Sequence, residues 1–325
     1  MFNIKLWGTR GSIPTPYTPE EVEQRTRYLF KKFFELGHSS REDLEPFFSS
    51  LPRHEFGGWG GNTACVEIKT SNTHLIIDAG SGLKHLSLEL MKGPLGKGQG
   101  EVHIYFTHFH WDHIWGLPFF VPLYIPGNTI HFHAVQKDLP EVMKTIFKKP
   151  FFPVPMETLG AKIVYHTLEP RKTVAINDVK LTPYQLDHPD PCWGYRIEHE
   201  GKSLAYCVDT EGVRISRLLL DRDLPLYQNI DLMIFDSQYT IEEAMDHMNW
   251  GHAAATIGID LAIREHIKKV AFVHHDPLAS DQKIADAEQQ AREYYKYEIG
   301  QLTKSGVKAH HVEWSFAREG DEFSL

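Results

Sequence analysis

The chain has few cysteines, no long apolar run and no excess of positive charge. Its 325 residues include three cysteines, Cys65, Cys192 and Cys207, which are too few for a disulfide framework and typical of a reducing compartment. No apolar stretch approaches the roughly 20 residues of a membrane span, and the N-terminal residues lack the features of a signal peptide. We therefore expect a cytoplasmic protein with no membrane partner. The net charge of -9 argues against capture of nucleic acid by bulk electrostatics.

One short region is dense in side chains that bind metals. His108, His110, Asp112 and His113 directly follow residues 102–106, an apolar run that predicts a buried strand. Alternate residues of an extended chain share a face, so His108 and His110 can bind one ion together. Asp112 and His113 are adjacent and must diverge once the strand ends, which suits them to a second ion. Imidazoles with a carboxylate favour Zn(II), with Mn(II) or Fe(II) as alternatives.

A site for two ions needs further ligands, and other strand-like runs end in suitable residues. His188, Asp209 and the pair His274–His275 each come after an apolar run. The sequence alone does not decide which of His274 and His275 faces inward, and His274 is our prediction. Asp78 closes another such run. It is either a turn cap or the acceptor of a hydrogen bond from a ligand histidine.

The strand-like run 129–135 contains a second alternating histidine pair, His131 and His133. No carboxylate or third ligand stands near them in the sequence. We therefore interpret them as residues of a surface strand rather than as metal ligands.

The order of strand-like and helical runs predicts sheets packed face to face with helices outside, an α+β architecture. Residues 119–124 are β-like, and residues 213–222 have helical spacing. Residues 18–53 are charged and aromatic, also with helical spacing, and they read as an insertion. We interpret this insertion as a helical flap that packs its aromatic side chains on the main body, with a lid over the substrate pocket as the alternative.

The combined pattern resembles the metallo-β-lactamase superfamily, and in particular its phosphodiesterase branch, which includes tRNase Z and the ribosyl cyclic-phosphate phosphodiesterases. Residues 107–113 match the HxHxDH motif of the family completely. His188, Asp209 and His274 match its later motifs in the right order. The resemblance implies an αββα sandwich of two mixed sheets, as a single domain over residues 1–325 with the helical insertion at about 18–53. Two further segments look like this branch, residues 7–14 and 61–65.

The resemblance also implies a ligand set for two divalent ions. One ion would be held by three histidines, the other by an aspartate and two histidines, and one more aspartate would bridge the two ions. These are His108, His110 and His188 for the first ion, Asp112, His113 and His274 for the second, and Asp209 as the bridge.

Two more residues match catalytic positions of tRNase Z-like enzymes. Asp236 stands where those enzymes have the glutamate of a His-Glu-Ala-Thr segment, and His252 matches a later histidine. The implied roles are that Asp236 orients His252, which protonates the leaving alkoxide. Aspartate is shorter than glutamate, which changes the geometry of this pair. Asp112 joins these two residues in the predicted catalytic set.

This chemistry predicts a phosphodiesterase. Two cations about 3.5–4 Å apart share a water and lower its pKa, so that a metal-bridging hydroxide can attack the phosphate. No Gly- and Lys-rich arm stands between His113 and Asp209, which favours a small or cyclic phosphodiester over RNA. The alternatives are a tRNA 3′-end processing endoribonuclease, a thioesterase or lactonase of the glyoxalase II type, and a binding module without activity. A homodimer stays open as the assembly.

Overall fold

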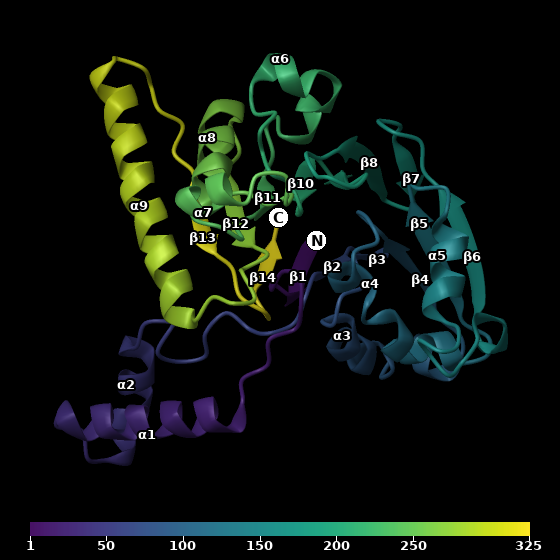
Figure 1. Cartoon of the computed structure of the whole chain (residues 1–325), viewed down its shortest axis with the longest axis horizontal. Helices are drawn as coiled ribbons and strands as arrows, with labels where there is room; N and C mark the ends of the chain where they lie inside the picture. The colour runs from purple at the N-terminus through teal and green to yellow at the C-terminus, as the bar shows by residue number, and fades with distance from the viewer.

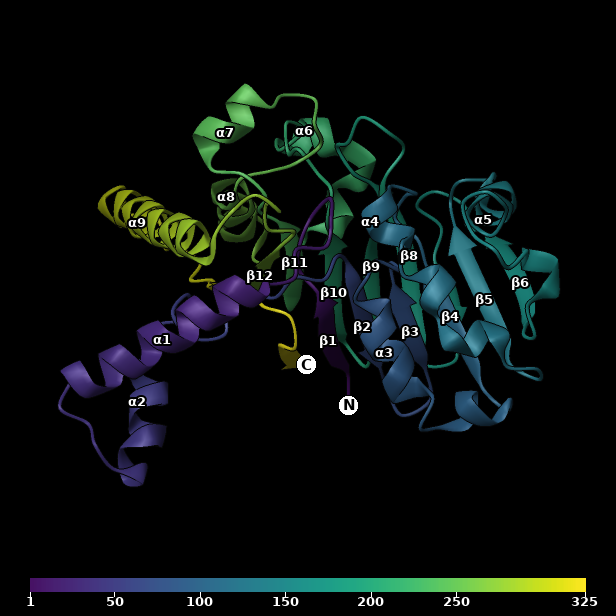
Figure 2. The same cartoon turned by 60° about the horizontal axis from the view of Figure 1, so that its bottom comes forward.

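Two seven-stranded sheets form the centre of the molecule in the computed structural model, which describes residues 1–325 (Figures 1 and 2). The first sheet has the order β14-β1-β2-β3-β4-β5-β6, and the second has the order β13-β12-β11-β10-β9-β8-β7. The strands of the first sheet are β1 (Asn3–Gly8), β2 (Cys65–Lys69), β3 (His74–Ile77), β4 (Glu101–Tyr105), β5 (Thr129–Ala134), β6 (Lys162–Thr167) and β14 (Glu322–Ser324). Those of the second sheet are β7 (Val174–Ile176), β8 (Val179–Gln185), β9 (Trp193–His199), β10 (Lys202–Cys207), β11 (Leu232–Asp236), β12 (Lys269–Val273) and β13 (Glu313–Phe316).

Both sheets are mixed, as the sequence predicts. Strands β3 to β6 run parallel in the first sheet, and β10 to β13 run parallel in the second. The remaining pairs, such as β1 with β2 and β8 with β9, are antiparallel. Parallel strands end at the same edge of a sheet. The residues that follow β3 and β4 therefore lie at one edge of the first sheet, and those that follow β10, β11 and β12 lie at one edge of the second.

Helices α3 and α5 cover the outer face of the first sheet, and α8 and α9 cover that of the second (Figure 2). One apolar cluster fills the space between the sheets, a second packs the first sheet against α3, and a third packs the second sheet against α8 and α9. The sandwich predicted from the sequence is therefore confirmed. The helices are α1 (Pro19–Glu35), α2 (Leu44–Ser50), α3 (Leu83–Leu90), α4 (Trp111–Ile114), α5 (Leu139–Ile146), α6 (Arg217–Leu220), α7 (Ile241–Asp246), α8 (Ala255–Glu265) and α9 (Asp281–Lys304).

Two local expectations were wrong. Residues 119–124 form no strand, because Leu117–Phe119 and Val121–Tyr124 are single 3₁₀ turns. Pro122 lacks a backbone N–H and its ring fixes φ, which favours a turn over a ladder strand. Within 213–222 the α-helix is limited to Arg217–Leu220. No helix anywhere in the chain has both the length and the apolar character that a bilayer crossing requires.

The predicted insertion is helical, but its aromatic side chains do not pack as we expected. Helices α1 and α2 lie below α9 and away from α4 in both views (Figures 1 and 2). The ring of Phe33 packs against Phe47, with 5.2 Å between centroids, whereas Phe30 and Phe34 are exposed. The aromatic side chains thus stabilise the insertion itself, and this placement gives no support to a lid.

The core between the sheets gives a test of the fold. Ile234 of β11 is fully buried in this core, so Ile234→Ala removes apolar contacts and leaves a cavity. We expect the free energy of unfolding to fall by about 2–5 kcal/mol, measured by urea denaturation. The control, Leu218→Ala, truncates a side chain that is 88% exposed and should change it by less than about 0.5 kcal/mol. Equal effects of the two substitutions would contradict this packing.

Candidate metal centre

The end of β4 leads directly into the candidate site. Thr107 follows the strand, and its backbone N–H donates to Oδ1 of Asp78, 2.9 Å away. Its hydroxyl donates to the same carboxylate and accepts from Nδ1 of His108 at 3.0 Å. The ring of His108 therefore has the tautomer that leaves Nε2 with a lone pair, free to bind a metal.

Three of the predicted ligands form a compact group. The ring centroids of His108 and His110 are 4.4 Å apart, and the centroid of His188 is 4.8 Å from the former and 4.9 Å from the latter. One nitrogen from each of the three lies within 4.8 Å of the others. Nδ1 of His188 lies 3.0 Å from the carbonyl oxygen and 3.2 Å from the backbone nitrogen of Asp190, whereas its Nε2 is buried without a hydrogen-bond partner and is the atom left for a ligand role.

A second group surrounds Asp209. Its Oδ2 is 2.8 Å from Nε2 of His113, and its Oδ1 is 3.2 Å from Nε2 of His274. Oδ2 of Asp112 lies 3.3 Å from the same nitrogen of His113 and accepts from the backbone N–H of Ser12 at 2.9 Å. Asp209 also groups with His108, so it stands between the two groups. The structure thus brings all seven predicted ligands together.

Three residues of the site have left-handed backbone conformations. Asp78, Asp209 and His274 have φ values of 59°, 62° and 65°, and each follows a strand of the parallel part of a sheet. Non-glycine residues rarely adopt this conformation, and strain of this kind concentrates at functional sites. The sharp turn directs each side chain across the end of the sheet. This is why residues at three different strand ends can meet.

The side-chain atoms of this cluster fit divalent cations. Nε2 of His108, His113, His188 and His274, together with Oδ2 of Asp209, are buried and have no hydrogen-bond partner. Buried polar atoms without partners are costly, and imidazole nitrogens with carboxylate oxygens are the donors that Zn(II) and similar ions take. A cation between these atoms would satisfy them. The individual ligand assignments stay predictions.

Burial and charge set the ionisation of this cluster. Burial lowers the pKa of His108 well below its usual range, and the neighbouring His113 adds to the effect. Burial also disfavours charge on His274, but the carboxylate of Asp209 outweighs it and raises the pKa of His274 to about 9. The pKa of Asp209 lies well below its usual value, because His274 and His113 outweigh its burial. Protons and cations therefore compete for the same atoms.

Asp236 and His252 lie beside the second group. Nδ1 of His252 donates to Oδ2 of Asp236 at 3.0 Å and lies 3.6 Å from Oδ1 of Asp209. The carboxylate of Asp236 is fully buried and also accepts from the backbone N–H groups of Gln238 and Ala253, at 3.0 and 3.1 Å. These contacts hold the aspartate so that it orients the imidazole, despite its being one methylene shorter than glutamate.

The structure distinguishes the adjacent pair His274–His275. His274 faces Asp209, whereas Nε2 of His275 donates to the carbonyl oxygen of Ala317 at 2.8 Å. His275 also stacks on Phe316 and lies in the core. Neighbouring residues point in different directions here because His274 has a left-handed φ.

Three contributors to the site were not predicted from the sequence. Oδ2 of Asp190 lies 2.9 Å from Nε2 of His110. The hydroxyl of Tyr206 donates to Asp78, which also accepts from Nδ1 of His113 at 2.8 Å. Gly251 has a φ of 87°, and a Cβ there would lie 2.2 Å from Cδ2 of His188. Only Asp190 carried a signal in the sequence, since it stands two residues after a candidate ligand.

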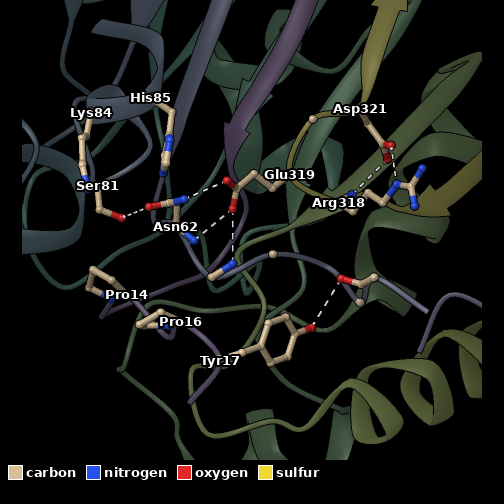
Figure 3. Close-up of a pocket in the computed structure, with 15 residues that line it drawn as sticks. Pro14, Pro16, Tyr17, Asn62, Ser81, Lys84, His85, Arg318, Glu319 and Asp321 are labelled. Atoms are coloured by element: carbon tan, nitrogen blue, oxygen red, sulfur yellow. Dashed lines mark hydrogen bonds and ion pairs between the residues drawn. The ribbon is translucent and has the colours of Figure 1, made fainter. Parts of the chain in front are cut away.

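A hollow of the surface opens away from the candidate metal centre. Figure 3 shows that it is lined by Asn62, Lys84, His85 and Glu319, and none of the predicted ligands takes part in it. The carboxylate of Glu319 is already used, since it accepts from the side chain of Asn62 at 2.8 Å. This hollow is therefore separate from the candidate metal centre.

Comparisons with known proteins agree with this geometry. A family model described as beta-lactamase superfamily domain matches residues 73–275. The chain is 21% identical over 277 residues to a ribonuclease Z of Prochlorococcus marinus (strain MIT 9301), with 66% of this chain and 82% of that protein covered. The structure of the metallo-beta-lactamase fold protein YhfI from Bacillus subtilis matches with a TM-score of 0.61 and 14% identity, covering 99% of this chain and 98% of that one. A diphosphatase of the PhnP family matches with a TM-score of 0.58 and 16% identity, covering 100% and 98%.

The place of Asp209 between the two groups gives a test of the ligand set. Asp209→Ala removes both carboxylate oxygens from His113 and His274, so we expect the purified protein to lose bound metal, measured by elemental analysis after dialysis. Asp209→Asn is the matched control, because asparagine tolerates the left-handed backbone and keeps one oxygen. It should retain more metal than the alanine variant. Wild-type metal content in Asp209→Ala would overturn the bridging role.

Proposed function

The chain belongs to the beta-lactamase superfamily of metal-dependent hydrolases, and we propose that it is a phosphodiesterase acting on a small or cyclic phosphodiester. The observation that carries this proposal is the pairing of Asp236 with His252 beside the candidate ligands. A phosphodiester releases an alkoxide, which needs a proton, whereas a thioester releases a thiolate that needs none at neutral pH. A positioned imidazole therefore favours phosphate esters over the glyoxalase II type of reaction.

We assign the metal-binding role to the seven side chains described above. His108, His110 and His188 would hold one divalent cation, and Asp209 would be shared with a second. Bound there, the cations would lower the pKa of a water and neutralise charge on the phosphate, with Zn(II) as the first choice and Mn(II) or Fe(II) as alternatives. The second cation would be held by Asp112, His113 and His274.

His252 is the proposed proton donor. Its Nδ1–H is used by Asp236, so Nε2 is the atom that carries the proton to the departing oxygen. The buried carboxylate stabilises the imidazolium before the transfer and fixes the direction of the ring. The ring also lies close to the candidate ligands, with 5.0 Å between its centroid and that of His274. A phosphate held by the proposed cations would therefore lie next to this acid.

Exposed aromatic side chains support a substrate that contains a base. Trp111 begins α4 directly after His110, Trp115 follows the end of that helix, and 57% and 50% of their surfaces are exposed. Trp250 is 61% exposed and stands two residues before His252. Stacking of a base on an aromatic ring contributes about 1–3 kcal/mol, independent of sequence. A cyclic nucleotide or a nucleoside cyclic phosphate suits this arrangement.

RNA is the second candidate substrate, because several relatives are named ribonuclease Z. The segment between α4 and β10 folds into the body of the protein as α5 and strands β5 to β9 (Figure 1). The net charge of -9 also weakens attraction to a phosphate backbone. These two features favour the small substrate.

Removal of the proposed acid should separate chemistry from metal binding. We expect His252→Ala to lower kcat by roughly 10²–10⁴ with unchanged metal content, because the ring donates a proton and is not a ligand. His85→Ala on α3, outside the metal centre, is the control and should retain wild-type kcat. Full activity of His252→Ala on the best substrate would contradict the assignment, as would loss of its metal.

A substrate panel tests the reaction class. The Zn(II)- or Mn(II)-loaded protein is assayed in parallel with bis-p-nitrophenyl phosphate, cyclic nucleotides, precursor tRNA and a glutathione thioester. We expect the highest kcat/KM for a small phosphodiester. A preference for precursor tRNA would make the chain a tRNA-processing nuclease, and faster thioester hydrolysis would refute the phosphodiesterase.

A further inference from the structure

Four histidines and a glutamate share one face of the first sheet, away from the candidate metal centre. His103 of β4 is in register with His131 of β5, and His133 of β5 is in register with His166 of β6. Glu101 stands two residues before His103 and therefore points to the same face. Because the three strands are parallel and adjacent, side chains from distant parts of the sequence form one continuous array.

Two imidazole nitrogens and a carboxylate oxygen converge at the open end of this array. Oε1 of Glu101 is 3.3 Å from Nε2 of His103 and 3.2 Å from Nε2 of His131. Charge-assisted N–H···O bonds are usually shorter, about 2.7–2.9 Å. Ligand atoms about 2.0–2.1 Å from one tetrahedral Zn(II) would instead be about 3.3–3.4 Å apart. The observed spacing thus fits two nitrogens and one oxygen around a single cation.

In His103 and His131, the ring nitrogen that is not near Glu101 also has a hydrogen-bond partner. Nδ1 of His103 is 2.9 Å from Nε2 of His133, and Nδ1 of His131 is 2.8 Å from Nε2 of His166. If each Nδ1–H donates to its partner, Nε2 of His103 and of His131 keeps a lone pair toward Glu101. Metal-binding histidines almost always donate their other ring N–H in this way, which fixes both the tautomer and the ring orientation.

Burial keeps the inner part of the array uncharged. His133 is only 5% exposed, and burial together with the neighbouring imidazoles lowers its pKa to about 2. Burial likewise lowers the pKa of His103 to about 4, so its ring is neutral at physiological pH. The outer groups are accessible, since the side chains of His103 and His131 are each 16% exposed and that of Glu101 is 62% exposed. Neutral imidazoles beside an accessible carboxylate are ready to bind a cation.

This arrangement corrects our interpretation of His131 and His133 as surface strand residues without further ligands. His133 is buried, and the third histidine and the carboxylate come from β4. In the sequence His103 and His131 are 28 residues apart. Only the parallel pairing of β4 with β5 brings them together.

We propose that Glu101, His103 and His131 form an additional site for a divalent cation such as Zn(II), with His133 and His166 orienting the two ligand rings. Solvent access leaves the fourth position to water. The site is separate from the catalytic centre, because His103 and His108 are five residues apart in extended chain, about 16 Å. A cation here would link β4 to β5, the neighbour of the edge strand β6, and so stabilise this end of the first sheet.

Zn(II) binding is measured on the metal-free protein by competition with a chromophoric chelator. The Glu101→Gln/His131→Ala double variant should bind one Zn(II) fewer per chain than wild type, with unchanged phosphodiesterase activity. Glu141→Gln on α5, an exposed glutamate outside the array, is the matched control and should bind as wild type. The Asp209→Ala variant should still bind the ion of this site, which separates the result from the proposed function.

Anomalous scattering at the zinc edge from wild-type crystals gives an independent readout. A peak within about 2.0–2.2 Å of Nε2 of His103, Nε2 of His131 and a carboxylate oxygen of Glu101 would support the proposal. Absence of a peak there at millimolar Zn(II) would overturn it. Equal stoichiometry for wild type and the double variant would also overturn it and would leave a purely hydrogen-bonded histidine array.

Discussion

The contact of Asp209 with His113 joins the two sheets at the site. Asp209 follows β10 of the second sheet, whereas His113 lies in α4, which follows β4 of the first sheet, and their side chains meet 2.8 Å apart. Both residues are buried, and neither the nitrogen nor the oxygen of this contact has an aligned hydrogen bond. Buried charges of this kind are tolerable only when they are paired or bind a metal. The site therefore depends on the packing of two sheets, because four of the seven predicted ligands follow a strand of the first sheet and three follow strands of the second.

Two further buried aspartates, Asp78 and Asp236, hold the residues around this contact in place. Asp78 accepts from Thr107, His113 and Tyr206 and so links the ends of β3, β4 and β10. Asp236 likewise holds His252, through a carboxylate that also accepts from the backbone N–H groups of Asp209, Gln238 and Ala253. Each buried aspartate thus fixes an imidazole to which we assign a chemical role. Rigid positioning of this kind is the main contribution a protein makes to catalysis of this class, because little reorganisation is then needed during the reaction.

Much of the fold and of the candidate site follows from local patterns. Each signal that could be identified lies within a few neighbouring residues. These signals are the motif at 107–113 after its strand and the apolar runs that end in His188, Asp209 and His274. Features that depend on register or on backbone twist could not be identified from the sequence. The choice of His274 over His275 depends on one left-handed residue, and the meeting of His103 with His131 depends on which strands are neighbours. The turns at 117–124 were misread because apolar residues between prolines look like a strand.

The left-handed residues at the strand ends limit which amino acids can occupy those positions. Asp78, Asp209 and His274 belong to types that tolerate positive φ more readily than most, and they also supply the side chains of the cluster. A replacement must satisfy both demands at once, so a glutamate at position 209 would meet the chemical demand but strain the backbone. Few amino-acid types can therefore replace these three residues, whether in evolution or in protein engineering. Redesign for a different cation has more freedom at His110 and His188, whose backbones are not in this conformation.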